Sequence, residues 1–203
     1  MRKGKLQDGM SYKERQMYLC KTQKAVSSHE KPLTGHWHCD ILILLGRSWD
    51  GSFLMIGGVF FVKIVVSACL LGRNCKYNGG NNFEPQVADF VRGREVIPVC
   101  PEVLAGLGIP RIPIEILDGK VIRRDGQVVD EAIRAAVARI LEQIKNEDIE
   151  CAVLKARSPT CGVRQVYDGT FSGKLVDGAG VLAWALKDAG YIVLDNEELE
   201  ETI

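Results

Sequence analysis

The seven cysteines of this sequence are the residues whose type and spacing suggest chemistry. Three of them, Cys69, Cys100 and Cys161, each follow a segment typical of a buried strand. Because the carboxyl ends of parallel strands meet at one sheet edge, where ligands bind, we expect these three thiols to converge. Cys75, in the polar loop behind Cys69, is the rival ligand. A single cysteine is more often a small core residue, and Cys151, inside a predicted strand, is expected to be one.

Histidine does not occur from residue 62 onward, since the three histidines of the chain are His29, His36 and His38. Within that part, the sequence excludes a Cys–His nucleophilic pair, a Ser–His–Asp triad and a zinc site with histidine ligands. Three thiolates without histidine suit a soft metal, either zinc or an iron–sulfur cluster. A [4Fe-4S] cluster held by only three thiolates leaves one iron open to a substrate or water, which is Lewis-acid chemistry.

Polar residues accompany these cysteines in the sequence. Glu102 lies two residues after Cys100, and Ser158 lies three before Cys161. A carboxylate beside a metal can activate water and a hydroxyl can relay a proton, whereas the alternatives are an exposed loop glutamate and a Ser-Pro turn. The glycine-rich segment 168–173 lacks the spacing of a phosphate-binding loop. Three basic residues can offset the charge of bound thiolates or can be solvated surface charges: Lys155, Arg157 and Arg164.

Strand and helix signals alternate from residue 62 onward and predict the elements that position these side chains. The fold class they predict is α/β, with three layers and a mostly parallel, Rossmann-like sheet whose strand carboxyl ends carry the cysteine loops. Prolines between residues 101 and 113 indicate a long loop, and Asp118-Gly119 indicates a hairpin between Glu115–Leu117 and Lys120–Arg123. The other predicted strands are Val62–Ser67, Glu95–Val99, Cys151–Leu154 and Tyr191–Leu194. Two of the predicted helices are Pro85–Arg92 and Gly180–Ala189. A third helix is predicted from the helical spacing of Ile133, Val137, Ile140 and Ile144.

The charge balance of the chain, 26 basic against 26 acidic residues, is a sum over two unlike parts. Residues 1–61 carry 9 basic and 5 acidic side chains, and residues 62–203 carry 17 and 21. We therefore predict an N-terminal extension, 1–61, and an α/β domain, 62–203. The extension is expected to be poorly ordered or to result from an upstream mis-start, with Val62 as the natural start; the alternative is a genuine interaction or anchoring segment.

The sequence also bears on partners and location. Its net charge of zero gives no reason to expect nucleic acid as a partner. The apolar run from Phe53 to Leu71 contains Lys63, and its uncharged part is too short to span a bilayer, so no membrane is expected. The odd number of cysteines and the lack of an apolar region behind the basic N-terminus favour the cytoplasm.

Five blocks of this sequence carry a resemblance to a known family. In order, they are 65–72 (VVSACLLG), 75–79 (CKYNG), 98–102 (PVCPE), 155–162 (KARSPTCG) and 167–173 (YDGTFSG). With these blocks the chain resembles the 2-thiouracil desulfurase family. It departs from the usual pattern at Thr160, where serine is commoner, and at Asn78, where aspartate is usual.

The resemblance implies a [4Fe-4S] cluster bound by Cys69, Cys100 and Cys161. It implies non-redox desulfuration of a thiolated nucleobase such as 2-thiouracil, giving uracil and hydrosulfide, with Glu102 and Ser158 as catalytic residues. The expected partner is thus a small thiolated nucleobase. The alternatives are a non-catalytic sulfur-handling or metal-binding protein, and a structural zinc domain.

Overall fold

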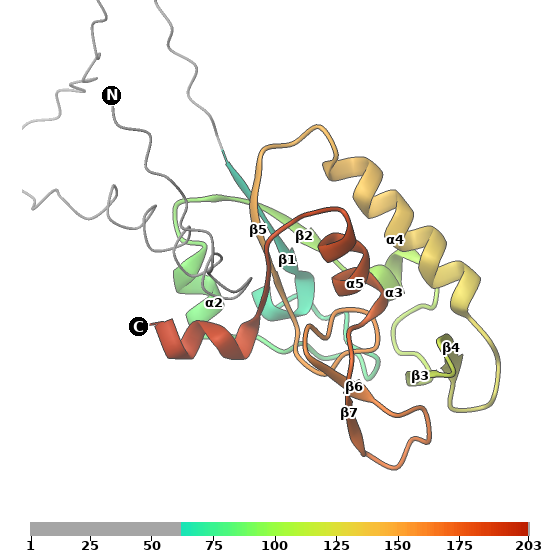
Figure 1. Ribbon diagram of the computed structural model, residues 1–203. Helices are drawn as coiled ribbons and strands as arrows, with labels where there is room; N and C mark the ends of the chain where they lie inside the picture. The colour runs from blue at the N-terminus through green and yellow to red at the C-terminus, as the bar shows by residue number, and fades with distance from the viewer. Residues whose placement is uncertain (1–61, 203) are drawn as a thin grey trace, which may run out of the picture. The chain divides into compact units, whose positions relative to one another are not determined.

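A four-stranded parallel sheet lies at the centre of the computed structural model, which describes residues 62–202 (Figure 1). Its strand order is β2-β1-β5-β8. Strand β1 pairs in parallel with β2 from Lys63 opposite Glu95 to Ser67 opposite Val99, and on its other side with β5. The strands are β1 (Lys63–Ser67), β2 (Glu95–Val99), β5 (Ile149–Leu154) and β8 (Val193–Asp195).

Helices cover both faces of this sheet. The helices are α2 (Pro85–Phe90), α3 (Pro101–Leu104), α4 (Asp130–Ile144) and α5 (Val181–Asp188), with two 3-10 helices, η1 (Ala68–Leu71) and η2 (Asn196–Thr202). On one face, Val65 of β1 packs in a cluster with residues of α4 and α5. On the other face, Ile64 and Val66 pack against α2 and η2. Since β1 is buried on both faces, its three central residues, Ile64–Val66, are all apolar, as is typical of a parallel strand.

Two antiparallel hairpins complete the described elements. The first joins β3 (Ile114–Leu117) to β4 (Lys120–Arg123) through Asp118 and Gly119, both of which have a positive φ. This geometry is that of the tight turn that Asp-Gly favours. The second joins β6 (Gln165–Tyr167) to β7 (Leu175–Asp177). It encloses the glycine-rich segment 168–173.

The predicted α/β class, the three layers and the parallel sheet are confirmed. Two local predictions were wrong. The predicted loop after Cys100 begins with the short helix α3, because Pro101 occupies its first position, where a missing N–H costs nothing. The last strand begins at Val193 instead of Tyr191. None of the helices in residues 62–202 is long and apolar enough to cross a membrane, and the predicted extension 1–61 lies outside the described residues.

Candidate functional site

Cys69 lies immediately beyond the central strand of the sheet. Strand β1 ends at Ser67 and passes into η1, which contains Cys69 and is closed by Gly72 in the left-handed conformation (φ +83°). The backbone N–H of Asn82 bonds to the carbonyl of Cys69 at 3.0 Å, so the following loop folds back over the thiol. Burial raises the pKa of the Cys69 thiol, and a hydrogen bond from the Asn82 side chain and the charge of Lys155 reduce this effect.

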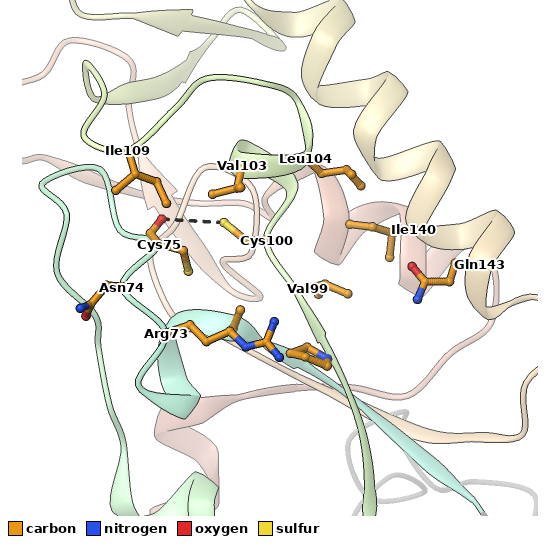
Figure 2. Close-up of a pocket in the computed structure, with 12 residues that line it drawn as sticks. Arg73, Asn74, Cys75, Val99, Cys100, Val103, Leu104, Ile109, Ile140 and Gln143 are labelled. Carbon is orange, nitrogen blue, oxygen red and sulfur yellow. Dashed lines mark hydrogen bonds between the residues drawn. The ribbon is translucent and has the colours of Figure 1, made fainter.

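Cys100 and Cys75 meet beside it. Cys100 directly follows β2 as the residue that caps α3, and its Sγ lies 3.9 Å from the carbonyl oxygen of Cys75 (Figure 2). Cys75 is buried. Its burial, and then the neighbouring thiols of Cys100 and Cys69, raise the pKa of Cys75 to about 12. These contacts bring the rival ligand into the same group as two of the predicted ligands.

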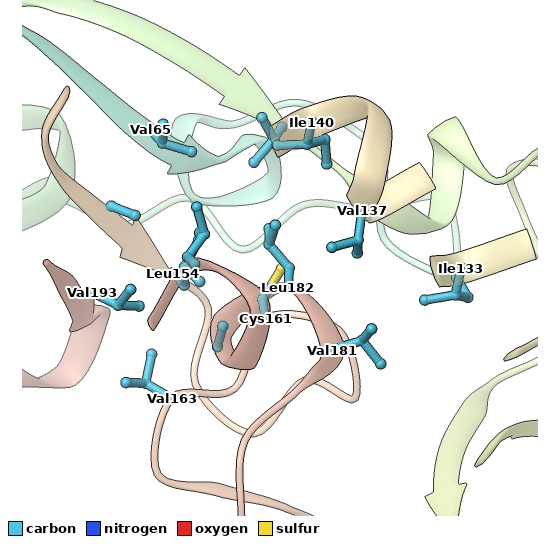
Figure 3. Close-up of a cluster of buried hydrophobic side chains, with 14 of the residues drawn as sticks. Val65, Ile133, Val137, Ile140, Leu154, Cys161, Val163, Val181, Leu182 and Val193 are labelled. Atoms are coloured by element: carbon cyan, nitrogen blue, oxygen red, sulfur yellow. The ribbon is translucent and has the colours of Figure 1, made fainter. Parts of the chain in front are cut away.

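Cys161 reaches this group from the loop after β5. Its side chain is buried, and Figure 3 shows it among apolar residues that include Leu182. Burial raises the pKa of Cys161 to about 12, and the nearby thiols of Cys69 and Cys100 add to this rise. Hydrogen bonds from Ser67 and Thr160 act in the opposite direction, because they favour the thiolate. The strands that precede the three predicted ligands, β2, β1 and β5, are neighbours in the sheet, and the expected convergence at their carboxyl ends is therefore observed.

The loop that carries Cys161 is docked on the first turn of α5. The carbonyl of Thr160 accepts the N–H of Leu182 at 2.8 Å, and the carbonyl of Gly162 accepts the N–H of Gly180 at 2.8 Å. The approach is so close that a Cβ on Gly180 would lie 2.5 Å from the carbonyl carbon of Thr160. The carbonyls of the loop thus cap the free N–H groups at the start of α5, and these bonds fix the position of the loop.

A hydrogen-bonded path joins Ser158 to Glu102. Ser158 Oγ accepts the backbone N–H groups of Thr160 and Cys161, both at 3.2 Å, and lies 3.1 Å from Thr160 Oγ1. Thr160 Oγ1 donates to Glu102 Oε1 at 3.1 Å and lies 3.6 Å from Cys161 Sγ. Thr160 has one hydroxyl proton, which it can donate either to Glu102 or to Cys161. When it donates to Glu102, it accepts from Ser158, and the bonds run from Ser158 to Thr160 and on to Glu102. The other oxygen of Glu102 accepts from Arg111.

The donor set fits an iron–sulfur cluster. Three thiols converge, one buried (Cys161) and two half-buried (Cys69 and Cys100), and residues 62–203 contain no histidine that could join them. Neighbouring thiolates repel one another, and a bound metal centre would stabilise the charged forms that act as ligands. Among residues 62–202, no three His, Cys, Asp or Glu side chains form a group that could hold a single metal ion. A four-iron cluster is larger than one ion, so its three ligands lie further apart.

The basic residues near the site separate into two groups. The charge of Lys155 acts on Cys69, and its Nζ donates to the carbonyl of Ala156 at 3.2 Å. Arg157 instead pairs with Glu197 at 2.7 Å and Arg164 with Glu198 at 3.0 Å, both with half-exposed side chains. For these two arginines the surface interpretation is therefore correct.

Two site residues were not predicted from the sequence. Thr160 was noted only as a departure from a motif, although its hydroxyl is the link between Ser158 and Glu102. Arg111 lies in a loop at no recognisable spacing from Glu102, and only the fold brings them together. A cavity of about 430 Å³ is lined by Cys75, Cys100 and apolar residues of α3, and its lining does not include Glu102 or Ser158 (Figure 2).

Thiols at the carboxyl edge of a parallel sheet, with a carboxylate held beside them, define an α/β protein with a cysteine-lined centre. Residues 64–198 match the family described as 2-thiouracil desulfurase, and the chain belongs to this family. Among solved structures, it is similar to the [4Fe-4S]-dependent thiouracil desulfidase TudS, with 33% identity, a TM-score of 0.64 and coverage of 70% of this chain and 95% of TudS. It is also 36% identical over 150 residues to the uncharacterized protein YbbK of Bacillus subtilis (strain 168), with coverage of 69% of this chain and 99% of YbbK.

Proposed function

We propose that this protein is an iron–sulfur-dependent desulfurase that converts a thiolated nucleobase such as 2-thiouracil, with water, into uracil and hydrosulfide. Its family and its likeness to TudS support the class of activity. The observation that carries the proposal to this chain is the path that joins Glu102 through Thr160 to the neighbourhood of Cys161. It places a carboxylate beside the proposed ligands.

Cys69, Cys100 and Cys161 are the ligands that we propose for a [4Fe-4S] cluster. When bound by three thiolates, such a cluster supplies a Lewis-acidic iron for the sulfur of the substrate. We propose that Cys75 does not bind the cluster, because this buried residue lies in the loop that follows Cys69 and not at the end of a strand. Cys151 lies within β5 in the cluster of side chains that packs on α2, on the sheet face opposite Cys161.

Glu102 is the proposed general base. In the reaction, the C=S bond of the substrate is replaced by C=O: the oxygen comes from water, and the sulfur leaves as hydrosulfide. Glu102 takes a proton from the attacking water, so that the oxygen can bond to the ring carbon. Arg111 and Thr160 both donate to this carboxylate, and their bonds hold it in one position.

Ser158 is proposed to assist Glu102 in two ways. Its oxygen accepts two backbone N–H groups, which fixes the turn that presents Cys161. Its proton is directed to Thr160, whose own proton is directed to Glu102. A hydroxyl pair of this kind keeps the carboxylate oriented and can return a proton through the same path.

The test is anaerobic purification and cluster reconstitution, followed by iron analysis, an optical spectrum and measurement of uracil and sulfide from 2-thiouracil. We expect about four irons per chain and sulfide equal to the uracil formed. Glu102→Gln should keep the iron and lose activity by a factor of about 100 or more. A folded protein that takes up no iron, or a Glu102→Gln variant with unchanged activity, would contradict the proposal.

Glu150→Gln is the matched control for this experiment. Glu150 is as buried as Glu102 and also pairs with an arginine, Arg94, at 2.9 Å. It lies at the start of β5, at the end of the sheet opposite the cysteines. Its substitution removes a comparable ion pair, so both iron content and activity should remain at the level of the unmodified protein.

We also propose that the natural domain begins at Val62, directly before β1. The support is the change in composition at this point and the start of the first strand at Lys63. N-terminal sequencing of the protein expressed from its own gene tests this. A first residue at position 62 is expected, and recovery of the full chain would refute it.

A further inference from the structure

Arg111 joins three segments of the chain around the candidate site. Its Nε donates to Glu102 Oε2 at 2.8 Å, and its Nη2 lies 2.7 Å from the same oxygen in an ion pair. Nη2 also donates to the carbonyl of Cys75 at 2.9 Å, and Nη1 to the carbonyl of Gly108 at 3.0 Å. Its backbone N–H bonds to the carbonyl of Tyr77 at 2.7 Å. One side chain therefore ties α3 and the loop 73–79 to its own loop.

The ion pair between Arg111 and Glu102 is buried. The side chains are 5% and 14% exposed, respectively, which is the lowest exposure among the ion pairs of the described residues. A pair this deep must have its remaining donors and acceptors satisfied, and here they are: Thr160 donates to the second oxygen of Glu102, and two carbonyls accept from Arg111. Glu102 consequently has only one orientation that keeps all of these bonds.

We propose that Arg111 is the positioning residue of this site, which holds Glu102 oriented for its action on water and at the same time fixes the loop that carries Cys75. The inference rests on the proposed function, in which Glu102 is the base. Arg111 acts through Glu102 and through the Cys75 carbonyl, which are its hydrogen-bond partners at the site.

The chemistry of the guanidinium group explains why arginine stands here. It is planar and permanently charged, and its five N–H donors diverge toward several acceptors at once. A lysine at this position retains the charge but has a single ammonium group. It cannot reach Glu102, the Cys75 carbonyl and the Gly108 carbonyl together, because these acceptors lie on three segments of the chain.

The first measurement compares Arg111→Gln with the unmodified protein after cluster reconstitution. We expect the same iron content and optical spectrum, a kcat for 2-thiouracil that is lower by about 10- to 100-fold, and a KM within about threefold of the original. Arg111→Lys should also lose kcat, since charge alone does not orient Glu102. If Arg111→Gln fails to fold, Arg111→Lys alone decides the question: unchanged kcat in that variant overturns the proposal.

A double-variant cycle separates positioning from general structural support. If Arg111 acts through Glu102, the variant with both Glu102→Gln and Arg111→Gln should be no less active than Glu102→Gln alone. Losses that multiply in the double variant would overturn the proposal. Arg94→Gln, which removes the matched pair with Glu150, is the control and should leave kcat unchanged.

Amide hydrogen exchange tests the second half of the proposal without any activity. In Arg111→Gln, the amides of residues 73–79 should exchange at least about tenfold faster than in the unmodified protein, because the bond to the Cys75 carbonyl is lost. In Arg94→Gln they should not change. Unchanged amide exchange in Arg111→Gln would overturn this proposal, whether or not the protein desulfurates thiouracil. An unmodified protein that binds no iron would overturn the proposed function alone.

Discussion

Gly180 is the position at which a single methyl group should disturb the site most directly. Its φ of −66° and ψ of 160° are accessible to alanine, so a Gly180→Ala substitution introduces no backbone strain of its own. The added Cβ, however, would lie 2.5 Å from the carbonyl carbon of Thr160, 2.7 Å from its oxygen and 2.8 Å from the nitrogen of Cys161. All three are backbone atoms, which cannot rotate away as the end of a side chain can.

The magnitude follows from what must move. Relief of the overlap separates the Cys161 loop from α5 and weakens the bonds that Gly180 and Leu182 donate to Gly162 and Thr160. Overpacking of a buried position costs about 1–3 kcal/mol and the two weakened bonds together about 1 kcal/mol, so we expect a loss of about 2–4 kcal/mol in the free energy of unfolding. With a urea dependence of about 2 kcal/mol per molar, the unfolding midpoint should fall by about 1–2 M.

The assay is urea unfolding of the purified chain followed by far-UV circular dichroism, with iron content measured on the same preparation after anaerobic reconstitution. Gly180→Ala should unfold earlier and bind less iron, because Cys161 is displaced. Gly178→Ala is the matched control, since the nearest atom to its Cβ is a methyl of Val166 at 3.4 Å. If Gly180→Ala keeps both its midpoint and its iron, the docking of the loop on α5 does not fix the position of Cys161.

Three further outcomes are expected. Thr160→Val should keep its iron and lose about 10- to 100-fold in kcat, whereas Thr160→Ser, which retains the hydroxyl, should stay within a few-fold; equal kcat in both would refute the Ser158–Thr160–Glu102 path. Single Cys→Ser variants at positions 69, 100 and 161 should lose most of their iron, and those at 75 and 151 should retain it; loss at 75 alone would transfer the ligand role to Cys75. Burial raises the pKa of Asp130, but its bonds with Arg134 and the Val121 N–H outweigh this and lower it below 3.8 overall. The contribution of this carboxylate to stability is therefore fully present above its unfolded pKa and is lost as the pH falls through its lower folded pKa. Asp130→Asn should make the free energy of unfolding fall less steeply as the pH is lowered. The same acid dependence in the variant and the unmodified protein would contradict this.

The sequence predicted the sheet and the convergence of the strand-end cysteines well because both depend on local pattern. Glu95–Val99 forms a strand with the predicted limits, and the cysteines follow strands whose parallel pairing brings their ends together. The basic residues could not be assigned in this way. Arg157 and Arg164 are held by Glu197 and Glu198, which are far along the chain and meet them only in the folded protein.

The same limit applies to the residues that orient Glu102. Arg111 lies nine positions after Glu102, and Thr160 lies 58 positions after it. Neither separation corresponds to a helix or strand period, so no spacing rule connects them. Their contacts follow from the way in which α3 turns Glu102 back toward the loop after β5. A carboxylate close to the cysteines in sequence was recognisable, but its burial and its partners were not.

The position of β1 between β2 and β5 has a consequence for the order of assembly. Each of these parallel pairings joins segments that are distant in sequence, so it carries a cost in chain entropy, and we expect it to form after the local helices. The thiols of Cys69, Cys100 and Cys161 therefore become neighbours only once the centre of the sheet exists. A metal centre bound by all three would be inserted into a nearly folded domain, and nascent chains would carry separate, exposed thiols until that moment.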